Sequence, residues 1–170
     1  LSIQSNNLLL NGDLQGAAVN GALQREPASR ASGGALTIDL VHGRAPDSTL
    51  TQPVIFQTGN ASPVLGENDP FPLQADKPGE SIPLNLPTDL YQRSGILTAD
   101  IKTAGKVEVK SGELINVEPT GRLALQGGSV QVDGTIRAAS GMVKLTTQIP
   151  TTLTVGGVNP FDGAVTLGAN

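Results

Sequence analysis

The chain of 170 residues contains no cysteine and no tryptophan, and it has a single histidine. Without cysteine there is no disulfide bridge, no zinc–thiolate site and no thiol nucleophile. The acidic residues show no calcium-loop spacing, and the glycine pairs lack the lysine and the helix of a phosphate-binding loop. The sequence therefore predicts no metal site and no other cofactor.

Large rings, long apolar runs and blocks of charge are also scarce. There are three Phe and one Tyr, too few for the ring-rich core or cleft of many compact domains. No apolar run approaches the roughly 20 residues that span a bilayer, which predicts no membrane insertion. The net charge of −4 is spread along the chain, which argues against a nucleic-acid partner.

Glycine and proline are abundant instead, with 21 and 12 residues. Between residues 105 and 147 they separate short bursts in which apolar and polar residues alternate. Alternation with period two is the signal of a β-strand, because successive side chains point to opposite faces. The apolar pairs of these predicted strands are Val107/Val109, Ile115/Val117, Leu123/Leu125, Val130/Val132, Ile136/Ala138 and Val143/Leu145.

Every third pair returns after about 20 to 23 residues: residue 107 to 130, 115 to 136 and 123 to 143. This spacing gives three short strands per turn of a coil, and it predicts an all-β fold built as a parallel β-helix. The alternative is an antiparallel β-sandwich, whose strands recur every 8 to 12 residues or so. The closer spacing in this chain favours the coil.

The rest of the chain is less regular. In the first 40 residues we expect strands at residues 8–10, 14–19 and 35–40. Residues 41–93 hold eight of the twelve prolines, and proline is excluded from central strands. This zone is predicted to be an excursion from the coil, with edge strands at most at residues 54–56 and 82–86. Thr88 to Arg93 is predicted as a helical turn with Thr88 as its N-cap.

Two runs carry a resemblance to a known family: residues 94–99 (SGILTA) and 126–138 (QGGSVQVDGTIRA). The second run shows Val130-x-Val132-x-Gly134-x-Ile136-x-Ala138, followed by Gly141 and then Val143-x-Leu145. This pattern resembles the repeats of the filamentous haemagglutinin-like exoproteins of bacteria. The resemblance covers residues 94–147 well and the remainder loosely.

The resemblance implies a right-handed parallel β-helix in a large protein exported by two-partner secretion. We therefore expect residues 1–170 to form a single β-helical domain, a fragment of a larger secreted or cell-surface bacterial protein. Its expected work is structural and adhesive, with a host-surface glycan or protein and the neighbouring domains as partners.

If the chain has a contact site, the 41–93 excursion is where we expect it, because excursions escape the packing constraint of stacked strands. The segment 67–80 (ENDPFPLQADKPGE) combines four acidic residues with one ring between prolines. The alternative is that this ring only pins the loop to the coil. The candidate contact residues are Asp69, Phe71, Asp76, Lys77 and Tyr91.

The competing function is a polysaccharide lyase or hydrolase on a β-helix, which needs two facing carboxylates. The candidates are Asp100, Glu108, Glu113, Glu118 and Asp133. Glu108 shares a strand face with Lys106 and Lys110, which indicates a solvated face with paired charges. His42 with Ser48 and Asp47 lacks a nucleophile elbow. We therefore predict that the chain is not an enzyme.

Overall fold

The computed structural model describes residues 1–5, 7–18, 33–41, 51–59, 82–147 and 163–168. These residues form a mostly-β structure of stacked parallel sheets with one short helix, α1 (Leu90–Ser94). No described helix has the length and apolar character needed to cross a membrane. The strands are β1 (Ser2–Gln4), β2 (Gly34–Asp39), β3 (Val54–Gln57), β4 (Leu84–Pro87), β5 (Ile96–Lys102), β6 (Lys106–Val109), β7 (Leu114–Val117), β8 (Arg122–Gly127), β9 (Ser129–Val132), β10 (Thr135–Ala138), β11 (Met142–Thr147) and β12 (Val165–Leu167).

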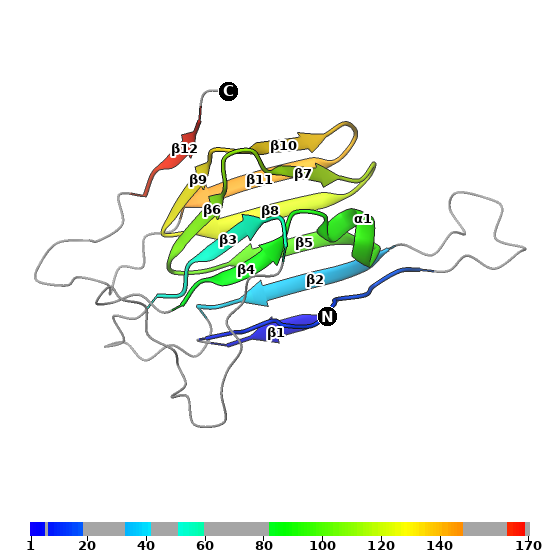
Figure 1. Ribbon diagram of the computed structural model, residues 1–170, viewed down its shortest axis with the longest axis horizontal. Coiled ribbons are helices and arrows are strands. Elements are labelled where there is room, and N and C mark those ends of the chain that lie inside the picture. Colours follow the sequence, from blue (N-terminus) through cyan, green and yellow to red (C-terminus); the bar gives the residue numbers. More distant parts are fainter. Residues whose placement is uncertain (6, 19–32, 42–50, 60–81, 148–162, 169–170) are drawn as a thin grey trace, which may run out of the picture.

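The strands form three sheets (Figure 1). Sheet 1 has the order β1-β2-β5-β8-β11, sheet 2 the order β4-β3-β6-β9-β12, and sheet 3 pairs β7 with β10. From β5 onward the chain runs through sheets 1, 2 and 3 and then re-enters sheet 1 one strand further on. This is a parallel, solenoid-like arrangement in which each turn stacks on the one before.

The register confirms the repeat predicted from the sequence. Val107 lies opposite Val130, Ile115 opposite Ile136, and Leu123 opposite Val143. Every pairing among the described strands is parallel. The antiparallel sandwich is therefore wrong for this part of the chain, because β6 pairs with β3 and β9 and does not pair with its neighbour in sequence, β7.

The core lies inside the stack, where the inward side chains of the three sheets meet. Each inward position stacks on an apolar residue of the next turn, so that Ile38 lies opposite Ile101, which lies opposite Leu125. All three are at most 1% exposed. Phe56 is 1% exposed in β3 and is the largest fully buried side chain. Short aliphatic residues fill this narrow interior, which accounts for the scarcity of rings.

Of the two edge strands predicted within residues 41–93, only one lies at a sheet edge. The strands β3 and β4 both lie in sheet 2, and β3 is an interior strand between β4 and β6, not an edge strand. Proline is tolerated there because Pro53 precedes β3 and contributes only its carbonyl, which accepts the N–H of Leu84 at 2.8 Å. Strand β4 does lie at the sheet edge, as predicted, and Pro87 closes it.

Two of the three strands expected near the start are not formed. Residues 8–10 and 14–18 are irregular, whereas β2 confirms the third. Residue 19 lies outside the described residues. Leu8, Leu10 and Leu14 pack against the core, and they cover it at the end of the stack where β1 lies. Their apolar character reflects this covering role, which a run of leucines does not distinguish from a buried strand.

Helix α1 lies between β4 and β5 and packs against β5 and β7. Its predicted N-cap is wrong by one residue: Asp89 occupies that position and makes no side-chain capping bond. The helix ends at Gly95, whose φ of 65° is left-handed. A Cβ at Gly95 would lie 2.5 Å from the Cα of Ala17, so only glycine fits this close approach.

Candidate functional site

The outward face of sheet 1 carries a hollow of about 270 Å³. It extends over the three neighbouring strands β5, β8 and β11, whose inward residues are aliphatic. The register places Asp100, Ala124 and Lys144 on one line across these strands, and Lys102, Gln126 and Thr146 on the next. Side chains on one line are about 4.8 Å apart, the spacing of paired strands.

Ala124 forms the floor of this sheet 1 hollow. It faces outward between larger neighbours and is only 7% exposed. Because its side chain ends at Cβ, the longer side chains of Asp100 and Lys144 stand above it on either side. Arg122 extends the wall along β8 and is exposed.

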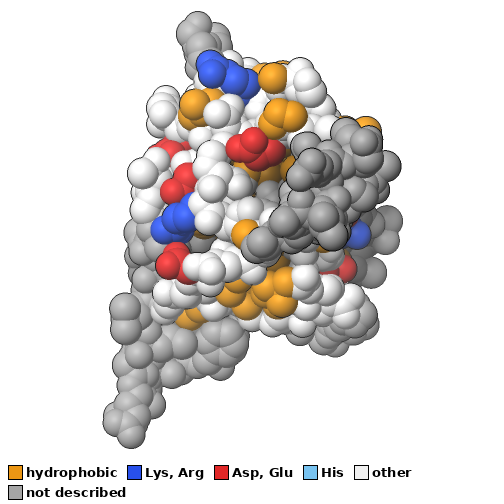
Figure 2. All heavy atoms as spheres, turned by 90° about the vertical axis from the view of Figure 1, so that its right-hand side faces the viewer, with side chains coloured by type: hydrophobic (Ala, Val, Ile, Leu, Met, Phe, Trp, Pro, Cys, Tyr) orange, Lys and Arg blue, Asp and Glu red, His pale blue; other side chains and the backbone are white. Residues whose placement is uncertain are grey.

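The charge of the hollow is distinct from that of the rest of the described surface. Arg93, Lys106 and Lys110 each form an ion pair with a carboxylate. Within the described ranges, no ion pair involves Lys102, Arg122, Lys144 or Arg137, and the first three of these line the hollow. With Asp100 as the one carboxylate, the hollow carries a formal charge of +2 in a chain of net charge −4. Elsewhere the signs are mixed, and the described atoms of the face shown in Figure 2 carry no block of either sign.

Glu108 shows the paired arrangement predicted from the sequence. Its carboxylate lies 3.1 Å from Nζ of Lys106 and 3.0 Å from Nζ of Lys110. Burial of this carboxyl raises its pKa, but the hydrogen bonds and charges of the two lysines outweigh that effect, so the pKa lies below the ordinary value. A carboxyl held in its ionised form by two cations is unsuited to donate a proton as a general acid.

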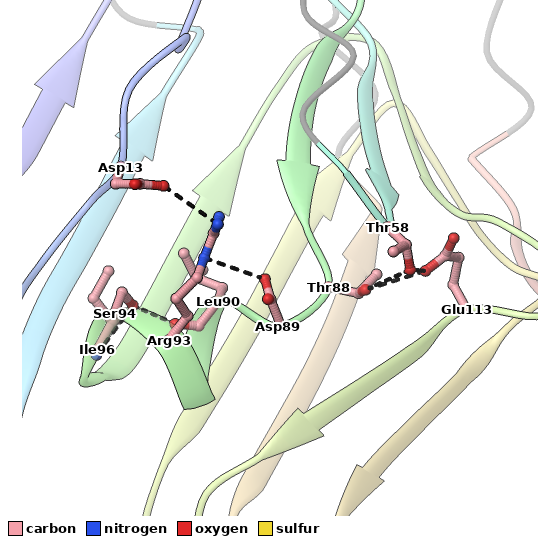
Figure 3. A network of polar contacts seen from close by, with 9 residues as sticks. All are labelled: Asp13, Thr58, Thr88, Asp89, Leu90, Arg93, Ser94, Ile96 and Glu113. Carbon is pink, nitrogen blue, oxygen red and sulfur yellow. Dashed lines mark hydrogen bonds and ion pairs between the residues drawn. The ribbon is translucent and has the colours of Figure 1, made fainter.

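Glu113 belongs to a polar cluster where three strands end or begin (Figure 3). Its carboxylate accepts hydrogen bonds from the hydroxyls of Thr58 at 2.6 Å and Thr88 at 3.1 Å. These hydrogen bonds, that of Thr58 first, hold the pKa of Glu113 below its ordinary value. The cluster therefore joins the turns after β3 and β4 to the turn before β7. Thr88, predicted as a helix cap, has this role instead.

A second network in Figure 3 joins the helix to residues 7–18, far away in the sequence. Arg93 lies 3.4 Å from the carboxylate of Asp13 and 3.7 Å from that of Asp89, one helical turn earlier. All three side chains are more than half exposed, so the ion pairs are worth at most about 1 kcal/mol. A small, partly open pocket of about 20 Å³ lies nearby between Leu10, Leu14 and Leu90. It has room for about one water molecule and none for a ligand.

The candidate contact residues predicted from the sequence are not brought together on a described surface. Asp69, Phe71, Asp76 and Lys77 lie outside the described residues, as do His42, Asp47 and Ser48. Tyr91 is only 2% exposed, and its hydroxyl donates to the carbonyl of Arg122 at 2.7 Å. Burial raises the pKa of this phenol well above its ordinary value. Tyr91 is therefore a core residue of α1, and its prediction as an exposed partner contact is wrong.

The five carboxylates considered for catalysis lie on strands of two sheets and in the turns beside β7 and β9. Asp100 lies on sheet 1 opposite Thr37 and Ala124, and Glu108 lies on sheet 2 opposite Ile55 and Gln131. Glu113 and Glu118 lie before and after β7, and Asp133 follows β9. The register sets no two of these five directly opposite each other. Across the described part of the chain, no three His, Asp or Glu side chains gather as metal ligands.

The cations of the sheet 1 hollow were missed at the level of sequence. The signal for them was available, because the predicted register of residues 123 and 143 also aligns residues 124 and 144. Comparisons with protein-family models, with curated proteins and with solved structures find no match to this chain.

Proposed function

We propose that this chain is a structural and adhesive segment of a secreted or surface-exposed bacterial exoprotein, of the filamentous haemagglutinin-like kind that its repeats resemble. In this proposal it binds host or surface glycans or proteins, and it is not an enzyme. Residues 1–170 form one β-helical domain of a larger protein and adjoin further domains of it.

One observation supports this proposal best: the parallel stacking of successive turns in a single register. Such a stack holds outward side chains in rows on a rigid frame, and rows of fixed side chains suit binding to a repetitive surface. The register sets no two of the five candidate carboxylates opposite each other, and this supports a binding role over glycoside cleavage, which needs two of them at a set distance.

In the same proposal the coil is right-handed. Crossovers between parallel strands of one sheet are right-handed in about 98% of known cases. The connections from β5 to β8 and from β8 to β11 are crossovers of this kind. An experimental structure with a left-handed coil would contradict this part of the proposal.

The test is a glycan and host-matrix binding array, run beside a screen for polysaccharide degradation. We expect saturable binding to at least one arrayed surface and no turnover. Measurable turnover would favour the polysaccharide-acting enzyme instead. Absence of binding to every glycan and matrix protein would contradict the adhesive role.

A further inference from the structure

We propose that the sheet 1 hollow binds an acidic sugar residue, with the sugar carboxylate held by Arg122 and Lys144. This proposal rests on the proposed adhesive function and names both the site and the chemical class of its ligand. The ligand class is a polysaccharide that contains uronic acid, and the hollow binds one sugar residue of it.

Among the described residues, three of the four Lys and Arg side chains without an ion pair line the hollow. Elsewhere in the described chain Lys106 and Lys110 share an ion pair with Glu108, and Arg93 pairs with two aspartates. Lys102, Arg122 and Lys144 converge on one hollow without such a partner among the described residues. A guanidinium presents its donors in a planar fork that matches a carboxylate, so Arg122 is suited to a bidentate contact.

The hollow also contains one carboxylate, that of Asp100. Asp100 stands opposite Lys144 across Ala124, two strand spacings or about 9.6 Å away. It repels a ligand that is anionic throughout, such as a phosphate or a densely sulfated chain. It accepts hydrogen bonds from hydroxyl groups, which a sugar residue supplies on the side away from its carboxylate. Gln126 and Thr146 add an amide and a hydroxyl to the same wall.

The hollow is small, and its walls are rigid. The hollow, about 270 Å³, falls just below the roughly 300 Å³ at which pockets for drug-sized ligands begin, so it suits one sugar residue. Its walls stand on three paired strands, so little backbone ordering is needed on binding. The two described rings, Phe56 and Tyr91, are both buried in the core. In the described part of the surface, charge and hydrogen bonds must therefore supply the affinity.

The experiment titrates the full chain with a short oligogalacturonate and with its methyl ester, which has the same backbone but no carboxylate charge. One variant removes charge: Arg122→Gln combined with Lys144→Gln. A second variant, Ala124→Leu, fills the floor and leaves every charge in place. The matched control is Arg137→Gln, which removes a cation that lies on β10 in sheet 3. Circular dichroism of each variant checks that the fold is retained.

We expect the acid to bind at least about tenfold more tightly than the ester, since charge-assisted hydrogen bonds are the strong ones. Both hollow variants should lose at least about tenfold in affinity for the acid, whereas Arg137→Gln should bind as the parent chain does. Equal loss in Arg137→Gln would show general charge attraction and overturn the proposal. Equal competition by inorganic sulfate would also overturn it, because the site would then be a plain anion site.

The array described above separates the two proposals. Binding to other glycans or matrix proteins, without binding to oligogalacturonate, overturns the hollow as an acidic-sugar site and leaves the adhesive role standing. Binding to oligogalacturonate that survives both hollow variants does the same. Absence of all binding contradicts the adhesive role itself.

Discussion

At the scale of single residues, Gln52 is a buried polar side chain on which we expect the stability of the fold to depend. It is 4% exposed, and its amide forms three hydrogen bonds with backbone groups of two distant segments. The oxygen accepts from the N–H of Leu8, and the nitrogen donates to the carbonyls of Leu8 and Ile82. Its own carbonyl accepts the hydroxyl of Thr103. A buried polar group of this kind is stabilising only while every partner is present.

We therefore expect Gln52→Ala to lower the free energy of unfolding by about 2–4 kcal/mol, because three partly buried hydrogen bonds to backbone groups are lost at once. The matched control is Gln92→Ala, whose amide makes one exposed hydrogen bond to the carbonyl of Asn116 and which should cost less than about 1 kcal/mol. Urea unfolding followed by circular dichroism measures both. Equal midpoints for the two variants would contradict the role assigned to Gln52.

A pH dependence follows from Glu113. Its pKa in the folded chain is lowered from 4.5, chiefly by the hydrogen bonds of Thr58. A lowered folded pKa means that the stabilisation is present above the ordinary value and is lost as the pH falls through the folded value. Glu113→Gln should therefore reduce stability near neutral pH, and the difference from the parent chain should shrink at an acidic pH at which Glu113 becomes protonated in the folded chain. Urea midpoints at the two pH values test this, with Glu118→Gln, at the other end of β7, as the control.

At the scale of the elements, each strand is buried only as far as its neighbours cover it. Val54, Val107, Val130 and Val165 form one inward line through sheet 2. The first three are at most 1% exposed, whereas Val165 in the edge strand β12 is 44% exposed. The same residue type thus has a core environment within the stack and a half-solvated one at its end, as expected of repeats that contact only their neighbours.

This gradient predicts unequal costs for one substitution. Val107→Ala removes two buried methyl groups and should cost about 2 kcal/mol. Val165→Ala removes the same groups from a half-exposed site and should cost less than about 1 kcal/mol. Chemical unfolding of the two variants gives the comparison. Similar losses would mean that β12 is covered in solution to the same extent as the interior strands.

At the scale of the whole molecule, the sequence predicted what depends on local alternation and on spacing. The register of residues 107, 115 and 123 with residues 130, 136 and 143 was readable, because one misplaced residue would turn every apolar side chain outward. The sequence did not predict that β3 and β4 belong to the stack, because prolines beside a strand cannot be told from prolines within a loop by sequence alone. The burial of Tyr91 depends on which segments meet, and that is decided by tertiary packing. The cations of the sheet 1 hollow were predictable only in part, because the predicted register covers β8 and β11 and does not include β5.

The cores at the two ends of the stack are covered to different extents. At the β1 end, Leu8, Leu10 and Leu14 pack against the core, and Gln52 holds the backbone of Leu8 in place. At the other end, Leu167 of β12 is 69% exposed and Val143 of β11 is 37% exposed. A solenoid needs its terminal turns covered for stability. The stability of this chain should therefore depend on one end far more than on the other.

We expect deletion of residues 1–18 to destabilise the fold severely, because it uncovers the core and leaves Gln52 without its partners at Leu8. Deletion of residues 163–170 removes β12, whose three residues are all exposed, and should leave a cooperative unfolding transition with a modestly lower midpoint. Circular dichroism reports the loss of β-structure in both variants, and the buried ring of Tyr91 supplies a near-ultraviolet signal for the packed core. Loss of that signal on deletion of 163–170, with retention on deletion of 1–18, would reverse the assignment of the ends.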